Sequence, residues 1–203
     1  MEQSKRDNTL VAAFFLSGAA ALTYEIVWSR LLQTVLGTTV HTASTILAAF
    51  LLGLSIGSFL LRNYHNSPGA SLNVLSCMEF SIAAYGALMV VLLSLLPRAY
   101  SYLPGSLVVR VVISLILILP PTILLGGLWP LVNRMYISDA TAIQAQSGTL
   151  YCANSLGSAF GALICGFVLV PLLGFRAASV TAILFNAAAG SVLFIAANKY
   201  ADQ

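Results

Sequence analysis

Glu25 is the side chain of this sequence best placed to do chemistry, because it lies inside a long apolar stretch, residues 9–36. A charged side chain near the middle of a membrane helix costs about 2.5–3.5 kcal/mol on insertion scales, so it normally faces a protein interior or a water-filled cavity. Tyr24 and Trp28 could offer aromatic faces to a cation, and Arg30 could pair with the carboxylate or tune it. We therefore predict that Glu25 binds a cationic substrate or a coupling proton. The alternative is a packing or snorkelling role.

Four further polar side chains interrupt apolar stretches. Tyr151 and Asn154 lie early in one of them, and we add both to the predicted binding set, with an ordinary interhelical hydrogen bond as the alternative for Asn154. Asn186 is predicted to make a structural hydrogen bond and not to bind a ligand, because no other polar residue lies near it in the sequence. Glu79 is a second ionisable candidate that could bind a ligand, snorkel to the nearer surface or pair with a basic group.

The composition is that of an integral membrane protein, with 59% hydrophobic and 7% charged residues. Soluble domains have about 25% charged residues. The 203 residues leave room for about six spans and too little polar sequence for a soluble catalytic domain. The net charge of +3 comes from scattered basic residues, which does not favour nucleic-acid binding. No metal-ligand spacing, phosphate-binding loop or nucleophile–base set is present, so we expect neither an enzyme nor a cofactor.

We predict an all-α membrane protein with six transmembrane helices in a single domain, residues 1–203. The double proline Pro120-Pro121 is expected to break the fourth helix between about residues 119 and 127, beside an aqueous cavity. The reason is that proline removes backbone donors, and carbonyls freed in lipid need another partner. The predicted helices are 9–36, 42–62, 72–96, 106–133, 148–173 and 177–198.

Small residues form close-packing faces on the second and fifth predicted helices. Gly53 and Gly57 form one face, and Gly157 and Gly161 belong to the other. Such faces let helix backbones approach closely where lipid gives no hydrophobic drive for association. Packing inside one bundle and packing between two copies both fit the pattern, and we predict a homodimer buried along these two helices.

The order of features predicts a 3+3 inverted repeat. The first and fourth helices each place a tryptophan before an arginine, Trp28/Arg30 and Trp129/Arg134, and the second and fifth are each rich in glycine. Because each half has three spans, the second half would be inverted, as in many secondary transporters. Six spans put both termini on one side, and the basic pair Lys5-Arg6 favours the cytoplasm.

Several of these segments resemble the membrane domain of bacterial spermidine synthase-like proteins. That family is similar to half of a major facilitator, which implies a bacterial inner-membrane protein and polyamine-related chemistry. Longer members carry a cytosolic aminopropyltransferase domain that has no counterpart in this sequence, so we expect no synthase activity. The segments that carry the resemblance are Phe15–Leu32, Ser44–Ser58, Pro120–Gly126, Trp129–Leu131, Leu150–Gly161 and Leu169–Gly174.

Two functions are compatible with these patterns. The first is a small secondary transporter, a homodimer of two six-helix halves that moves a small cationic, polyamine-like metabolite by alternating access, with proton coupling as an option. The second is a membrane anchor or regulatory module for a separate polyamine-synthesising enzyme. In that second case Glu25 would be a packing residue, and residues 138–147 would carry the partner contacts.

Overall fold

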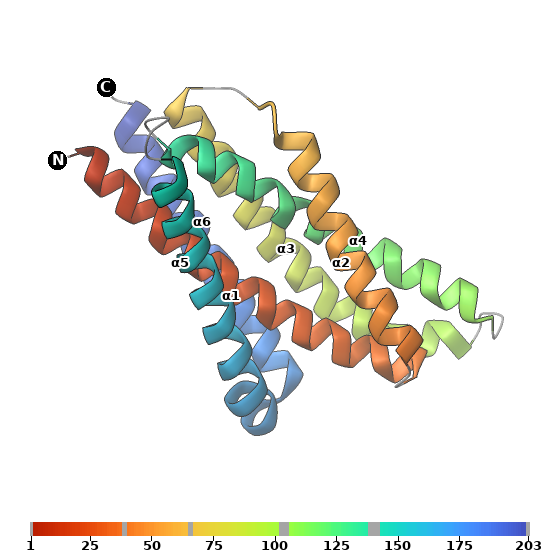
Figure 1. Ribbon diagram of the computed structural model, residues 1–203. Helices are drawn as coiled ribbons and strands as arrows, with labels where there is room; N and C mark the ends of the chain where they lie inside the picture. Colours follow the sequence, from red (N-terminus) through yellow and green to blue (C-terminus); the bar gives the residue numbers. More distant parts are fainter. Residues whose placement is uncertain (1, 38–39, 65–66, 102–105, 138–142, 202–203) are drawn as a thin grey trace.

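The structure is a computed structural model that describes residues 2–37, 40–64, 67–101, 106–137 and 143–201, and within these ranges it contains helices and no strand. Figure 1 shows the helices and the path of the chain between them. In chain order the elements are α1 (Glu2–Leu36), α2 (Val40–Leu61), α3 (Pro68–Ser101), α4 (Leu107–Tyr136), α5 (Ile143–Ile164), the π-helix η2 (Cys165–Leu173) and α6 (Gly174–Ala201).

Most predicted boundaries agree with these helices to within a few residues, with three local differences. The first helix is longer than predicted, because α1 begins at Glu2 and not near residue 9. The predicted loop 97–105 is wrong in its first part, because α3 continues through Pro97 to Ser101. The fifth helix starts earlier than predicted, because α5 begins at Ile143, and the π-helix η2 that follows it was not predicted. Residues 138–142 of the predicted partner-binding loop lie outside the described residues.

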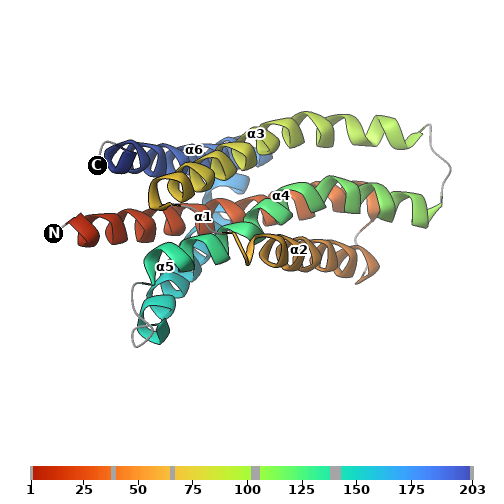
Figure 2. The ribbon, with the colours of Figure 1, turned by 90° about the horizontal axis from the view of Figure 1, so that it is seen from above.

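Five helical segments are long and apolar enough to cross a membrane. The last of them runs through α5, η2 and α6 without interruption. The chain turns back at Gly174, whose φ of 81° suits a residue without a Cβ. The first turns of α1 and the last turns of α6 lie at the same end of the bundle (Figure 2). These segments indicate a membrane protein, and they are Asp7–Thr34, Thr42–Leu61, Gly69–Leu96, Val108–Tyr136 and Ile143–Lys199.

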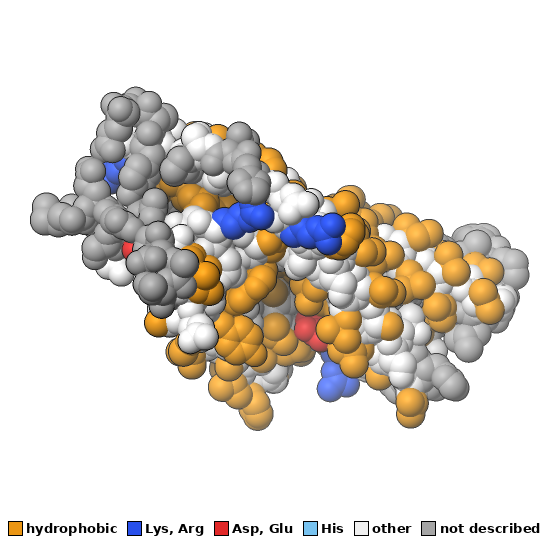
Figure 3. All heavy atoms as spheres, turned by 45° about the horizontal axis from the view of Figure 1, so that its top comes forward, with side chains coloured by type: hydrophobic (Ala, Val, Ile, Leu, Met, Phe, Trp, Pro, Cys, Tyr) orange, Lys and Arg blue, Asp and Glu red, His pale blue; other side chains and the backbone are white. Residues whose placement is uncertain are grey.

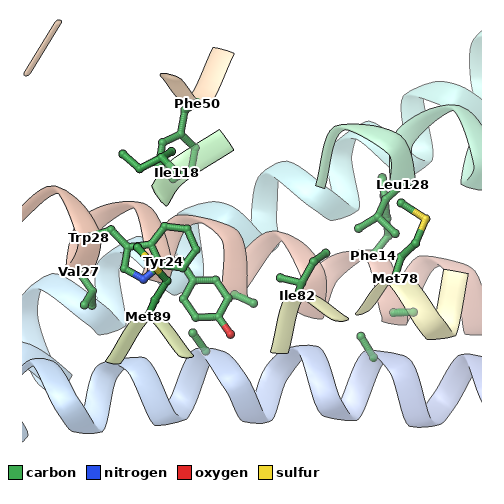
Figure 4. Close-up of a cluster of buried hydrophobic side chains, with 14 of the residues drawn as sticks. Phe14, Tyr24, Val27, Trp28, Phe50, Met78, Ile82, Met89, Ile118 and Leu128 are labelled. Carbon is green, nitrogen blue, oxygen red and sulfur yellow. The ribbon is translucent and has the colours of Figure 1, made fainter. Parts of the chain in front are cut away.

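The helices pack mainly in three pairs: α2 on α4, α5 on α1, and α3 on α6, with α6 also packed along α1. Leucines, valines and phenylalanines cover the outside of α2, η2 and α6, as expected of surfaces that meet lipid. The interior is filled by one continuous apolar cluster, in which Tyr24 and Trp28 are among the largest buried side chains (Figure 4).

The predicted small-residue face of α2 packs on α4 of the same chain. A Cβ at Gly57 would lie 1.9 Å from the carbonyl oxygen of Ile123, and Gly53 is equally close to α4. The contact is reciprocal, because a Cβ on Gly126 of α4 would lie 2.2 Å from the carbonyl oxygen of Leu54. Only glycine allows two helix backbones to come this close.

The second small-residue face packs in the same way, α5 on α1. A Cβ at Gly157 would lie 2.0 Å from the carbonyl oxygen of Phe15, and Gly161 meets α1 one turn further on. In return, a Cβ on Gly18 of α1 would lie 2.3 Å from the carbonyl oxygen of Asn154. Both glycine faces are therefore filled within one chain, which leaves neither of them free for the predicted dimer contact.

The predicted break in the fourth helix is not found, because α4 is continuous through Pro120 and Pro121. An α-helix tolerates an internal proline when another group takes the carbonyl four residues earlier. For Pro121 that carbonyl belongs to Leu117, and it accepts a hydrogen bond from the Tyr85 hydroxyl of α3 at 3.0 Å.

A third proline of α4, Pro130, is accommodated in the same way, by a side chain of a neighbouring helix. The carbonyl that it frees belongs to Gly126, and the Ser58 hydroxyl of α2 donates to it at 2.8 Å. Neighbouring helices thus replace the backbone donors that Pro121 and Pro130 remove, and α4 stays continuous past both prolines.

Candidate functional site

A cavity of about 290 Å³ lies between α1, α2, α4 and α5. This volume is near the lower end of the range for small-molecule sites. Its walls combine apolar and aromatic side chains with a few polar groups, among them Ser17, Glu25, Ser58, Asn154 and Ser158.

Glu25 is half-buried at this cavity and also borders a second, more open recess. Its carboxylate makes no hydrogen bond or ion pair with any residue that the structure describes. Arg30 is exposed and lines the recess together with Glu25 and Gln33, without pairing to the carboxylate. Figure 3 shows an acidic group in the middle of a largely apolar face, with a basic side chain beside it.

Three other polar side chains of the cavity donate hydrogen bonds to backbone carbonyls of neighbouring helices. The Ser58 hydroxyl donates to the carbonyl of Gly126 at 2.8 Å, and the Ser158 hydroxyl donates to the carbonyl of Gly18 at 3.3 Å. The amide nitrogen of Asn154 donates across to the backbone of α1 at 3.3 Å. These groups keep oxygen lone pairs for a ligand, as does the carboxylate, so this part of the wall favours a cation or a hydrogen-bond donor.

The aromatic part of the wall is not the one that the sequence predicted. Tyr24 and Trp28 are 0% and 1% exposed and stack on each other at 4.8 Å in the apolar core, so they offer no face to a ligand beside Glu25 (Figure 4). The cavity is instead lined by Phe14, Phe50 and Trp129, and the rings of Phe14 and Trp129 stack at 5.6 Å.

Tyr151 is also displaced from its predicted place. It is 65% exposed and lies edge-on against the ring of Trp129, outside the cavity. Of the predicted binding set, Glu25 and Asn154 line the cavity, Arg30 shares only the outer recess, and Tyr24, Trp28 and Tyr151 lie elsewhere.

Glu79 does not snorkel and meets no basic group in the part of the chain that the structure describes, so both structural expectations for it are wrong. It is 2% exposed and accepts a hydrogen bond from the amide nitrogen of Asn186. Asn186 therefore does make a hydrogen bond, but the expectation of an apolar neighbourhood is wrong, because a carboxyl from another helix lies against it.

The sequence carries a signal for the cavity serines, although neither serine was among the predicted binding residues. Each small-residue face contains the same Gly-Ser pair, within Gly53–Ser58 and again within Ala153–Ser158, where the pattern is small-x-Ser-x-Gly-Ser. The glycines bring the helices together, and the next residue then reaches the facing backbone. Phe14, Ser17 and Trp129 carried no comparable signal.

Comparison with known proteins identifies no relative of this chain. No family model matches the sequence, and neither the curated proteins nor the solved structures give a match. The resemblance to the membrane domain of spermidine synthase-like proteins therefore stays a prediction.

Proposed function

We propose that this protein is a secondary transporter for a small organic cation, polyamine-like in chemistry, which it moves by alternating access. The observation that carries the proposal is the cavity between membrane-length helices, where the Glu25 carboxylate has no partner among the described residues. An unpaired intramembrane carboxylate is costly unless it faces water or a ligand, and it marks a pathway in many transporters. The aromatic rings of Phe14 and Trp129 add favourable surfaces for a cation.

Six membrane spans fit this proposal better than five. The segment Ile143–Lys199 has 57 residues and would be about 86 Å long as a straight helix, whereas the hydrocarbon core of a bilayer is about 30 Å thick. The positive φ of Gly174 allows the chain to turn back there. We therefore divide the segment into two antiparallel spans.

An inverted repeat is supported by the two glycine-mediated helix contacts, α2 on α4 and α5 on α1. In one crossing Gly57 meets the Ile123 carbonyl, and in the other Gly157 meets the Phe15 carbonyl. The reciprocal contacts, Gly126 with Leu54 and Gly18 with Asn154, follow the same correspondence. Residues at equivalent positions of the two contacts differ in number by 100 between α2 and α5 and by 108 between α1 and α4.

The two serine bonds obey the same register. Ser58 donates to the carbonyl of Gly126, and Ser158 donates to that of Gly18. This correspondence between α1 and α4 differs from the one predicted from the sequence. The sequence pattern matched Trp129 with Trp28, whereas the helix contacts match Trp129 with Ala21.

The cavity lies where the two proposed repeats meet, which is where substrate sites of inverted-repeat transporters are found. Four corresponding pairs line it, and a rocking of one repeat against the other would change their separation on both sides of the membrane. These pairs are Ser17/Leu125, Ala21/Trp129, Leu54/Asn154 and Ser58/Ser158.

A homodimer in the bacterial inner membrane, with both termini in the cytoplasm, completes the proposal. Its contact surface would not be the glycine faces, which are filled within the chain. The recess lined by Glu25, Ser29, Arg30 and Gln33 is a better place for the second copy, because polar groups on a lipid-facing helix are costly. The two copies would then face each other across their cavities, like the halves of a major facilitator.

Counterflow of radiolabelled polyamines in liposomes tests the proposal. We expect saturable uptake by the wild-type protein and a strong loss in Glu25→Gln, which keeps the side-chain shape and removes the charge. Losing a charge-assisted contact of about 1.5–3 kcal/mol weakens cation binding by roughly 10- to 150-fold. Arg176→Gln is the matched control, because it removes one exposed charge at the start of α6, away from the cavity.

The outcomes separate the two functions considered for this chain. Uptake that survives in Glu25→Gln would remove this carboxylate from the mechanism. Wild-type liposomes that show no counterflow of any small organic cation would instead favour the anchor or regulatory role, for which co-purification with a soluble enzyme is the next measurement.

A further inference from the structure

The strongest unexplained feature of the fold is the buried carboxyl of Glu79, which lies where α1, α3 and α6 meet. The amide nitrogen of Asn186 on α6 donates to Glu79 Oε2 at 2.5 Å, and the Ser17 hydroxyl on α1 lies within hydrogen-bonding reach of the same carboxyl. Glu79 is 2% exposed and Asn186 is fully buried. Three helices therefore converge on one carboxyl deep in the bundle.

No cation compensates this carboxyl among the described residues. Tyr24 of α1 is the titratable side chain within electrostatic reach of it, and a tyrosine can supply no positive charge. From α6 the group in contact with Glu79 is the neutral amide of Asn186. An ionised carboxylate buried without a cation carries a large desolvation penalty, which protonation removes.

The amide of Asn186 supplies an independent observation. Its oxygen, Oδ1, is buried and has no hydrogen-bond partner, although the nitrogen of the same amide bonds Glu79. An orphan acceptor of this kind is costly inside a protein. A protonated Glu79 would donate its O–H to Oδ1 while still accepting from the nitrogen, and this reciprocal acid–amide pair leaves neither group of Asn186 unsatisfied.

Ser17 links this pair to the proposed substrate site. It lies on the wall of the cavity that also contains Glu25, and its hydroxyl is within hydrogen-bonding reach of Glu79. A hydroxyl can accept a proton from a cavity water while it passes its own proton on, so it can relay a proton without changing its own charge.

We propose that Glu79 is a proton-binding site, which holds its proton against Asn186 and exchanges it with the cavity through Ser17. Each exchange moves one proton between cavity water and the carboxyl, and the carboxyl alternates between neutral acid and carboxylate. The coupling of this proton to a cation at Glu25 rests on the transport function proposed above, whereas the proton site itself does not.

Infrared spectroscopy of the full chain in liposomes tests the site without any transport measurement. A protonated carboxyl gives a C=O stretching band that a carboxylate lacks. We expect this band in the wild-type protein at neutral pH, its loss in Glu79→Gln, and its retention in Glu25→Gln. Glu79→Gln should fold, because a glutamine amide can form the same reciprocal pair with Asn186.

A second variant keeps the test decisive if Glu79→Gln proves unstable. Asn186→Leu removes the partner of the acid, so the C=O band should shift to the higher frequency of a free carboxyl. The route is tested by Ser17→Ala, in which exchange of the acid proton with D₂O should be slower than in the wild-type protein. Exchange at the wild-type rate would exclude Ser17 as the relay.

The proton site is overturned if the wild-type protein shows no acid band at neutral pH, or if the band survives in Glu79→Gln. Its failure differs from a failure of the transport proposal. If the acid band belongs to Glu79 but the protein shows no uptake, the proton site is supported and the transport function is not. If the protein shows uptake but no acid band, only the proton site is refuted.

Discussion

The substitution Gly57→Ala tests the close helix crossing on which the cavity depends. The new Cβ would lie 1.9 Å from the carbonyl oxygen of Ile123, whereas ordinary contacts begin at 3.4 Å, so α2 and α4 would have to separate by about 1.5 Å. The obstacle is backbone, which cannot rotate away as a side chain could.

The expected cost follows from two opposing effects. Overpacking costs about 1–3 kcal/mol, and a rigid backbone obstacle places the cost near 3 kcal/mol. Alanine recovers about 1 kcal/mol through its better helix propensity. We therefore expect Gly57→Ala to lower the free energy of unfolding by about 2 kcal/mol.

Unfolding in detergent, followed by helical circular dichroism during titration with a denaturing detergent, measures this change. Gly157→Ala should cost about as much, because its Cβ would lie 2.0 Å from the carbonyl oxygen of Phe15. Gly166→Ala is the matched control, because no atom lies within 4 Å of its Cβ position, and it should be neutral or slightly stabilising.

The reasoning is refuted if Gly57→Ala and Gly166→Ala are equally stable, because the close approach would then carry no energetic weight. The double variant of Gly57 and Gly157 offers one more check. The two glycines lie in different crossings, so their effects should add to within about 0.5 kcal/mol.

Three further predictions follow from the hydrogen bonds and the cavity. Tyr85→Phe should cost about 1 kcal/mol in unfolding measurements, and the cost should vanish in a Pro121→Ala background, where the restored backbone donor reclaims the carbonyl. Ser58→Ala should likewise cost about 1 kcal/mol, and a neutral result would show that water replaces the hydroxyl. In a cysteine-free background, Asn154→Cys should react with a membrane-impermeant thiol reagent and Ile82→Cys should not; equal protection of both would mean that the cavity is closed to water.

Part of the candidate site could be predicted from single residues. Glu25 and Asn154 were identified because polar groups in apolar helices are expensive, and both line the cavity. The glycines were identified for an equally local reason, since small residues at four-residue spacing permit close approach. Whether they faced a helix of the same chain or a second copy could not be read from the spacing.

The aromatic partners of Glu25 could not be predicted from proximity in the sequence. Consecutive residues of an α-helix point about 100° apart, and here Glu25 faces the cavity while Tyr24 faces the apolar core. Tyr24 turns towards α3, where Gly86 leaves room for its hydroxyl. Trp129, one of the three rings that line the cavity, comes from a helix about a hundred residues later in the chain.

The broken helix was a wrong prediction with a clear physical origin. The sequence shows which donors the prolines remove, and it cannot show what replaces them. Ser58 and Tyr85 belong to helices that lie against α4 only in the folded chain, and their hydroxyls take the carbonyls that Pro130 and Pro121 free. Satisfied in this way, α4 remains continuous.

The sequence by itself determined that this is a helical membrane protein, where its apolar segments run, and which polar groups are too costly to be incidental. These properties depend on local composition and on the free energy of burying each residue in lipid. The tertiary structure alone decided which side chains share the cavity and that Glu79 meets Asn186, 107 residues away. Such pairings are set by which helix faces interlock, and that depends on contacts between glycines and backbones that no single segment contains.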